Sequence, residues 1–198
     1  MGGTPTPLPV PNPGPTAQSP GPHPGPEPGP SGTGQREYPK EAIFGKDAVF
    51  AAMPWNEAVQ AVTESAIDAK WDRRELTISV ARENIVPACE AVKAAGYNFF
   101  EDLTAVDWYP QEPRIQLSYH IVSYGLKQRV RLAVRLDSAD LTVDSITSVW
   151  PSSNFYEREI FDLFGVKFSG HPGLTRIMMP PDWKGHPLRK DYPVEGYR

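Results

Sequence analysis

The stretch IQLSYHIVSYGLKQRVRLAVRL, residues 115–136, decides the fold of this chain. Large apolar residues alternate with polar ones in both halves, which is the period of strands that bury one face. Gly125 lies in the short segment between the halves, so the pattern predicts a β-hairpin. Three of the polar positions in the second half are arginines: Arg129, Arg131 and Arg135. We therefore expect a mostly antiparallel sheet with helices packed on its apolar face.

Periodicity predicts further elements on both sides of this hairpin. In chain order these are a helix over 55–67, a strand over 76–80, a helix over 84–95, a strand over 97–108, and helices over 143–150 and 154–164. Asn154, followed by Glu157 three residues later, is typical of a capping box, and Gly165 is a natural end for the last helix. This order of helices and strands predicts an α+β fold.

Both ends of the chain differ from this body in composition. Residues 1–30 hold 12 of the 23 prolines and 6 of the 16 glycines, so we expect a disordered, Pro/Gly-rich leader over 1–34 with polyproline II character. Four prolines fall between Pro172 and Pro187, where regular structure becomes improbable. The predicted organisation is the leader, an α+β body over 35–164, and an extended C-terminal docking arm over 165–198.

Charge and cysteine content exclude several classes of function. The net charge of −4 gives no general argument for binding nucleic acid, although residues from 165 onward carry six basic and three acidic side chains. Cys89 is the single cysteine, which excludes an internal disulfide and an all-cysteine iron-sulfur site. There is no apolar run long enough to span a membrane and no glycine loop of the nucleotide-binding kind.

The densest charged motif is ERE followed by IFDLFG, residues 157–165. Glu157 and Glu159 could suggest the paired carboxylates of a hydrolase, but helical residues two apart point about 200° away from each other. Arg158 and Asp162, four apart, can form a salt bridge on one helix face. We therefore favour a docking surface or a solvated helix face over catalysis.

Two histidine motifs and a basic patch follow this helix. His171 and His186 each stand between a glycine and a proline, and they could either share a metal ion or form hydrogen bonds that hold an extended arm. Their surroundings contain no cysteine to complete a tetrahedral site, so we favour the hydrogen-bonded role. Arg189 and Lys190 are two adjacent positive charges, which are too few to predict nucleic-acid binding.

These motifs together resemble the C subunit of respiratory complex I, the 30 kDa subunit family of NADH:quinone oxidoreductase. The resemblance covers roughly residues 70–193 and is carried by 157–168, by Gly170-His171-Pro172, and by the run PDWKGHPLRKDYP over 181–193. Gly173 and Thr175 depart from the family pattern, which usually has aspartate and a basic residue there. The residues that would contact neighbouring subunits are Glu157, Arg158, Glu159, Asp162, His171, Arg176, His186, Arg189, Lys190 and Asp191.

The resemblance implies a structural protein that docks beside the D subunit at the quinone site, near subunits B and I, in a large hetero-oligomer. It implies no catalytic residue, cofactor or metal in this chain, because the FMN and the iron-sulfur clusters of the complex belong to other subunits. The implied place is peripheral, on the cytoplasmic side of the bacterial inner membrane. The alternatives are a homologous subunit of a photosynthetic plastoquinone-reducing complex or an energy-converting hydrogenase, and, from the leader alone, an adaptor for SH3-like partners.

Overall fold

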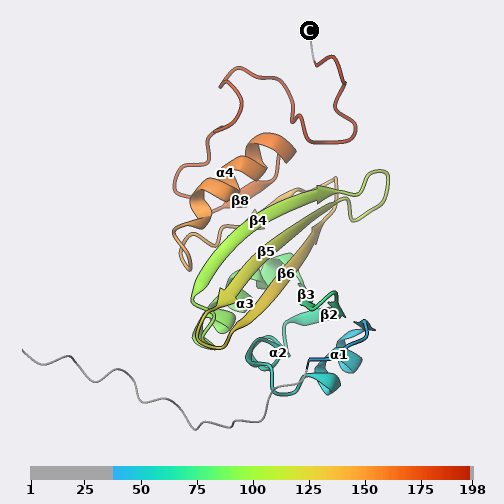
Figure 1. Cartoon of the computed structure of the whole chain (residues 1–198). Helices are drawn as coiled ribbons and strands as arrows, with labels where there is room; N and C mark the ends of the chain where they lie inside the picture. The colour runs from blue at the N-terminus through green and yellow to red at the C-terminus, as the bar shows by residue number, and fades with distance from the viewer. Residues whose placement is uncertain (1–37, 197–198) are drawn as a thin grey trace, which may run out of the picture. The chain divides into compact units, whose positions relative to one another are not determined.

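A six-stranded sheet forms the centre of the fold (Figure 1). The computed structural model describes residues 38–196, so the predicted leader lies outside the described residues. The elements are β1 (Ile43–Phe44), α1 (Lys46–Ala52), α2 (Glu57–Ala61), β2 (Ala66–Asp72), β3 (Glu75–Val80), the 3₁₀ turn η1 (Arg82–Asn84), α3 (Ile85–Ala94), β4 (Phe99–Asp107), β5 (Ile115–Ser123), β6 (Gln128–Leu136), β7 (Thr142–Asp144), α4 (Ser153–Phe164) and β8 (Lys167–Ser169).

The hairpin that the sequence predicts forms strands β5 and β6. Tyr119 lies opposite Leu132 and Leu117 opposite Val134, so apolar residues face apolar residues across the pair. The sheet order is β1-β2-β3-β6-β5-β4, in which β3 and β6 run parallel and the other neighbours run antiparallel. The predicted α+β class and the mostly antiparallel sheet are therefore confirmed.

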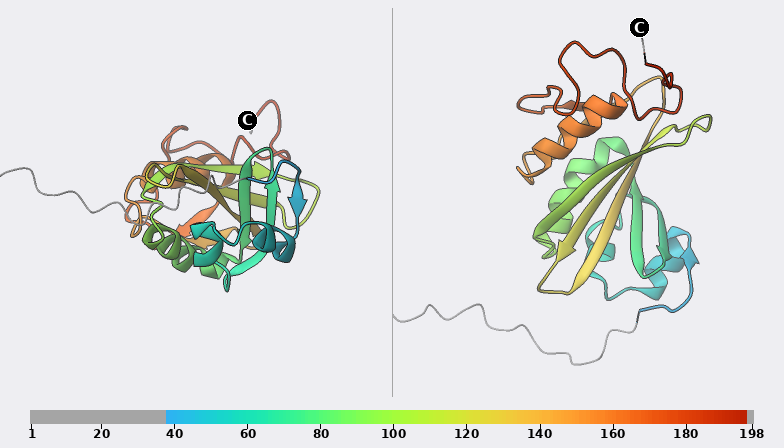
Figure 2. Two further views of the ribbon diagram at one scale, coloured as in Figure 1. Left: turned by 60° about the horizontal axis from the view of Figure 1, so that its bottom comes forward. Right: turned by 45° about the horizontal axis from the view of Figure 1, so that its top comes forward.

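The core lies on the apolar face of this sheet. Ile78, Leu117, Tyr119, Ile121 and Leu132 are at most 1% exposed and come from three adjacent strands. Each of the four aliphatic side chains among them contributes about 1.5–3 kcal/mol of stability through burial. Helix α3 lies behind this sheet in two views (Figures 1 and 2), and its buried residues belong to the same core cluster. The helix layer on the apolar face thus follows the prediction.

Helix α4 packs along β4, the last strand of the sheet (Figure 1). The Tyr156 hydroxyl donates to the carbonyl of Glu101 on β4 at 3.2 Å. The Phe100 ring stacks on Trp150, with ring centroids 5.6 Å apart, and meets Tyr156 edge-on at 5.9 Å. Helix α4 therefore covers an edge that would otherwise present unpaired backbone groups to solvent.

The helix predicted over 55–67 is wrong in its second half. Helix α2 covers only Glu57–Ala61, and its start is capped by Asn56, whose side chain accepts from the backbone N–H groups of Ala58 and Val59. Ala66 already belongs to β2, which pairs with β3. The hydrogen bonds of this strand pair thus override the weak helical periodicity. Helix α1 precedes this region and was not predicted.

The helix predicted over 143–150 is also wrong. Thr142–Asp144 forms strand β7, which pairs in parallel with β8, and turns follow up to Pro151. Val143 is 3% exposed because this pairing buries it beside Phe168. A strand of three residues is too short to show the alternating pattern of a strand. Its partner strand also comes more than twenty residues later.

Candidate functional site

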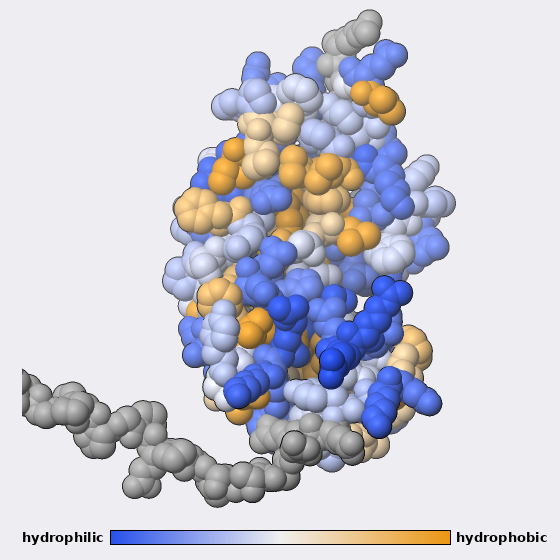
Figure 3. Space-filling model, viewed as in Figure 1, coloured by the Kyte–Doolittle hydropathy of each residue, from blue (hydrophilic) through white to orange (hydrophobic). Residues whose placement is uncertain are grey.

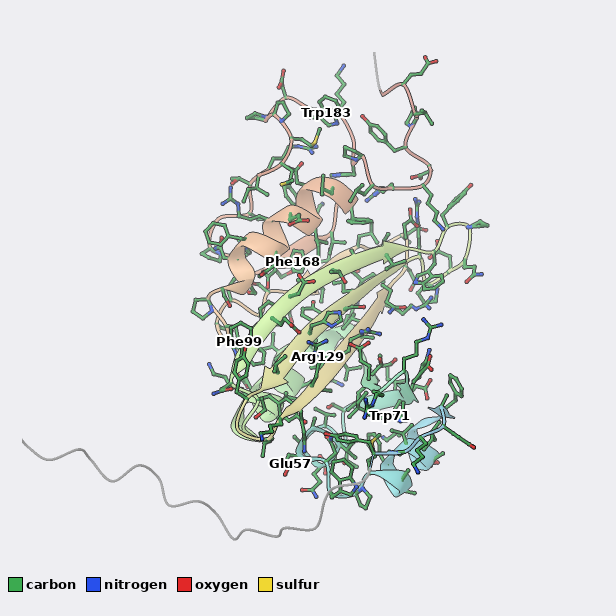
Figure 4. All side chains as sticks on the ribbon, in the orientation of Figure 1. Glu57, Trp71, Phe99, Arg129, Phe168 and Trp183 are labelled. Carbon is green, nitrogen blue, oxygen red and sulfur yellow. The ribbon has the colours of Figure 1, made fainter. Side chains whose placement is uncertain are left out.

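The arm that follows α4 folds back over the C-terminal end of that helix. After β8 the described residues contain no further regular element, as the prolines predict. Leu188 nevertheless donates its backbone N–H to the carbonyl of Leu163 at 3.1 Å, so the arm returns to the helix. Figure 4 shows Phe168 beneath α4 and Trp183 on the far turn of the arm. We define the arm as residues 170–196.

Asp162 fixes the first half of the arm. Its carboxylate is fully buried and accepts hydrogen bonds from the backbone N–H groups of Ile177, Met178 and Met179 at 2.7–2.9 Å. The Arg176 guanidinium pairs with the same carboxylate at 2.5 Å. Burial acts to raise the pKa of Asp162, but these donors outweigh it, and the pKa lies below its ordinary value. Asp162 is thus an anchor inside the chain.

The salt bridge predicted between Arg158 and Asp162 is wrong. Arg158 donates to the backbone carbonyls of Thr175 and Arg176 at 3.1 and 3.3 Å, and Asp162 pairs with Arg176 instead. Helical spacing indicates partners only within the helix, whereas both side chains find partners on the arm. Arg158 reaches a main-chain atom of Thr175, so this contact does not depend on the side chain at that position.

Gly165 allows the arm to approach the helix end closely. Its φ of 78° is left-handed, and a Cβ at this position would lie 2.6 Å from atoms of both His186 and Arg189. His186 donates from Nδ1 to the carbonyl of Asp162 at 2.9 Å, and Arg189 donates from Nε to the carbonyl of Phe164 at 2.6 Å. Two carbonyls at the helix end, which lack intrahelical partners, are thereby satisfied.

Asp107 and Arg114 hold the second half of the arm. Their side chains form a bidentate salt bridge, with N–O distances of 2.7 and 2.9 Å. The Asp107 side chain is 2% exposed and the Arg114 side chain is 8% exposed. Arg114 also pairs with Asp191 at 2.6 Å, and the backbone N–H of Lys190 donates to Asp107 at 2.8 Å. The hydrogen bonds from Arg114 hold the pKa of both aspartates below the ordinary range.

Glu157 is buried inside the body and not on a surface. Its carboxylate accepts from the Ser145 hydroxyl at 2.6 Å, the Ile146 backbone N–H at 2.9 Å and the Ser153 hydroxyl at 3.1 Å. Burial raises its pKa above the ordinary value despite these bonds. The predicted capping box is therefore wrong, because Glu157 reaches across to the loop before α4 and the helix starts at Ser153 with Ser152 before it.

The two histidines take part in hydrogen bonds with the main chain. His171 bonds from Nε2 to the carbonyl of Asn154 at 3.2 Å and accepts the backbone N–H of Gly173 on Nδ1 at 3.0 Å. His186 bonds to Asp162 as described above, and burial lowers its pKa. Within residues 38–196 no group of three or more His, Cys, Asp or Glu side chains is arranged to hold a metal ion.

The remaining predicted docking residues divide by exposure. Glu159 and Lys190 are exposed, whereas Glu157 and Asp162 are buried and offer no carboxylate at the surface of this chain. The sequence-based prediction did not include the exposed apolar residues here, namely Phe155 on α4 and Ile177, Met178, Trp183 and Leu188 on the arm. Figure 3 shows apolar side chains gathered over α4 and the neighbouring end of β4. The large apolar residues within the proline-rich arm are the sequence feature that could have indicated this exposed apolar surface.

The shifted carboxylates predict an acid-sensitive fold. Asp107, Asp162 and Asp191 have folded-state pKa values below the ordinary aspartate value of about 3.9, so they stabilise the fold above it and this contribution is lost as the pH falls through the folded-state values. Glu157 has the opposite effect on the pH dependence of stability. Because its folded-state pKa is raised, its contribution to stability falls as the pH rises above about 4.3.

We expect the three aspartates to outweigh the single glutamate. The free energy of unfolding, measured in urea, should fall as the pH is lowered from about 5 and should continue to fall below pH 3. Asp162→Asn should flatten this dependence, because the amide cannot titrate. An equal pH slope in the variant would contradict the role assigned to Asp162.

Comparison with known proteins gives consistent matches. The family model described as "Respiratory-chain NADH dehydrogenase, 30 Kd subunit" matches residues 78–198. The NADH-quinone oxidoreductase C subunit of Citrifermentans bemidjiense is 43% identical over 146 residues, covering 71% of this chain and 91% of that protein. The corresponding Geobacter sulfurreducens protein is 46% identical over 134 residues, covering 67% and 83%.

Among solved structures, a chain of the membrane-bound sulfane sulfur reductase, an archaeal respiratory membrane complex, has a TM-score of 0.60. It is 27% identical, and the match covers 68% of this chain and 82% of that chain. The class of protein is therefore a subunit of a multi-subunit respiratory oxidoreductase. The chain belongs to the 30 kDa subunit family of respiratory-chain NADH dehydrogenase. Its described helices include none with the length and apolar character that crossing a membrane requires.

Proposed function

We propose that this chain is a cofactor-free structural subunit in the peripheral arm of a proton-translocating NADH:quinone oxidoreductase. It docks beside the D subunit at the quinone site, near subunits B and I, and it supports electron transfer from NADH to quinone without supplying a catalytic residue. It lies on the cytoplasmic side of the bacterial inner membrane as a peripheral protein. Family membership supports this proposal, and the arm provides the physical argument for it.

The observation that carries the proposal is an arm held in one conformation while its apolar side chains stay exposed. Asp162 orders the backbone of Ile177, Met178 and Met179, yet Met178 is 61% exposed. Leu188 is also 52% exposed, although its backbone N–H donates to the carbonyl of Leu163. Exposed apolar side chains on a pre-ordered backbone favour association, because less conformational entropy is lost on binding. A partner protein is the natural cover for them.

The nearest alternative is the corresponding subunit of a related complex. The match to the archaeal sulfane sulfur reductase favours it, although the NADH-quinone oxidoreductase relatives are more similar in sequence. The two complexes can be distinguished by purifying the assembly through a tag on this chain and testing its electron donor. Quinone reduction driven by NADH supports the proposal, and reduction that needs another electron donor supports the related complex.

A pull-down from gently solubilised membranes tests the docking role directly. We expect the full chain to recover subunits B and D, and a chain cut after Gly165 to lose them. Because truncation also removes the partners of Asp162, surface variants give the cleaner result. Met178→Ser with Leu188→Ser should reduce recovery at least tenfold, since both side chains are exposed and their loss leaves the anchor intact.

Ile67→Ser with Tyr124→Ser provides the matched control. These residues are 64% and 67% exposed and lie outside the arm, so recovery of the partners should remain at the level of the unmodified chain. Undiminished assembly by both the truncated chain and the arm variant would overturn the docking proposal.

A further inference from the structure

Three residues other than glycine have a left-handed backbone within residues 38–196, and all three are basic. They are Arg73, Arg74 and Lys127, with φ values of 52°, 65° and 53°. All three line the same pocket, of about 370 Å³, together with Arg129. Figure 4 shows Arg129 on β6 and Trp71 on β2 near the same end of the sheet. The coincidence of charge, backbone conformation and position requires a physical explanation.

The parallel pairing of β3 with β6 brings these residues together. Arg73 and Arg74 form the turn between β2 and β3, and Lys127 ends the turn between β5 and β6. Because Leu76 lies opposite Val130 in a parallel register, the two turns meet at the same end of the sheet. The stacked rings of Tyr38 and Trp71, 5.3 Å apart, supply a wall of the pocket.

The charges in this pocket are unbalanced. Four cations line it and Glu75 is its single carboxylate, which already pairs with Arg131 and lies 3.6 Å from His120. Arg129 pairs with Glu101. Within the described residues no ion pair is seen for the other three cations, which leaves an excess of positive charge at the pocket. Figure 3 shows strongly hydrophilic side chains over this part of the same face.

Turn stability does not explain these residues. A two-residue hairpin turn with two left-handed positions favours Asn-Gly, since the Cβ atom of most other residues lies too close to the following carbonyl oxygen in this conformation. Arg73 and Arg74 occupy both positions of such a turn. Strained residues of this kind concentrate at ligand-binding sites, where the strain accompanies a functional side chain.

We propose that this pocket binds a phosphate-bearing anion through Arg73, Arg74 and Lys127. Arginine offers paired N–H donors that match phosphate oxygens, and lysine adds a mobile point charge. The phosphate belongs either to a soluble molecule or to the headgroup of an anionic lipid. This site lies outside the arm, so the proposal goes beyond the docking function.

Titration of the full chain tests the proposal with two probes. Inorganic pyrophosphate should shift the backbone amide signals of the two turns in NMR spectra, and vesicles of phosphatidylglycerol should bind more chain than vesicles of phosphatidylcholine if a headgroup is the source. Arg73→Asn with Arg74→Gly should weaken binding of the effective probe at least tenfold. This variant should also keep or raise the melting temperature, because Asn-Gly suits the turn.

Arg82→Gln with Arg135→Gln is the charge-matched control. Both arginines lie away from the pocket, Arg82 paired with Asp140 and Arg135 stacked over Trp108, so binding should change less than twofold. Pyrophosphate binding identifies a soluble ligand, and vesicle binding alone identifies a headgroup. An equal loss in control and turn variants, or no binding of either probe, would overturn the site.

Discussion

Arg114→Leu is expected to destabilise the chain by about 3–5 kcal/mol, the typical cost of removing one partner from a buried ion pair. Asp107, which is 2% exposed in the intact chain, would lose its compensating charge, and only the backbone N–H groups of Tyr109 and Lys190 would still donate to it. Asp191 contributes less, because it is nearly half exposed and its pairing is screened by solvent. Chemical denaturation followed by tryptophan fluorescence measures the change.

Two further variants separate this ion pair from the bulk of the side chain. Arg135→Leu changes an exposed arginine on β6 and should shift stability by about 0.5 kcal/mol or less. Adding Asp107→Asn to Arg114→Leu should recover part of the loss, because a neutral amide leaves no buried charge. A loss of equal size in Arg135→Leu would rule out the buried pair as the cause.

Asp162→Ala should release the first half of the arm. Three backbone N–H groups would lose their acceptor and Arg176 would lose its carboxylate, so we expect a loss of about 3 kcal/mol or more. Hydrogen exchange resolves the effect by position: the amides of Ile177, Met178 and Met179 should lose protection, while those of β5 and β6 keep theirs.

Asp137→Ala is the control for this substitution, since Asp137 is exposed and its carboxylate shows no ion pair within the described part of the chain. Its stability and its exchange pattern should match those of the unmodified chain. Retained protection at 177–179 in Asp162→Ala would show that something other than the carboxylate orders the arm.

The body of the fold could be predicted because its pattern is local. Alternation along β5 and β6 fixes which residues face the core, and a shift by one residue would expose Tyr119 and Leu132. Gly165 could likewise be predicted as the end of α4, because a glycine directly after a helical pattern is a local signal. Strand β7 could not be predicted, because its partner β8 lies on the far side of a helix.

The contacts within the candidate site could not be predicted from the sequence. Charge and proline patterns point to residues 157–191 as the candidate site, but they give no sign that Glu157 and Asp162 are buried. A buried carboxylate is tolerated only when donors surround it, and those donors come from the loop before α4 and from the arm. No local pattern indicates the role of Arg114, because its two partners are 7 and 77 residues away.

The parallel junction between β3 and β6 also constrains the order in which the chain acquires its structure. The β2–β3 hairpin can form early during synthesis, but its inner strand gains its second neighbour only when residues 130–133 have left the ribosome. Contacts this distant in sequence form slowly because a long loop must close first. Until then β3 presents an open edge, and the nascent chain exposes that edge to chaperones and to other nascent chains.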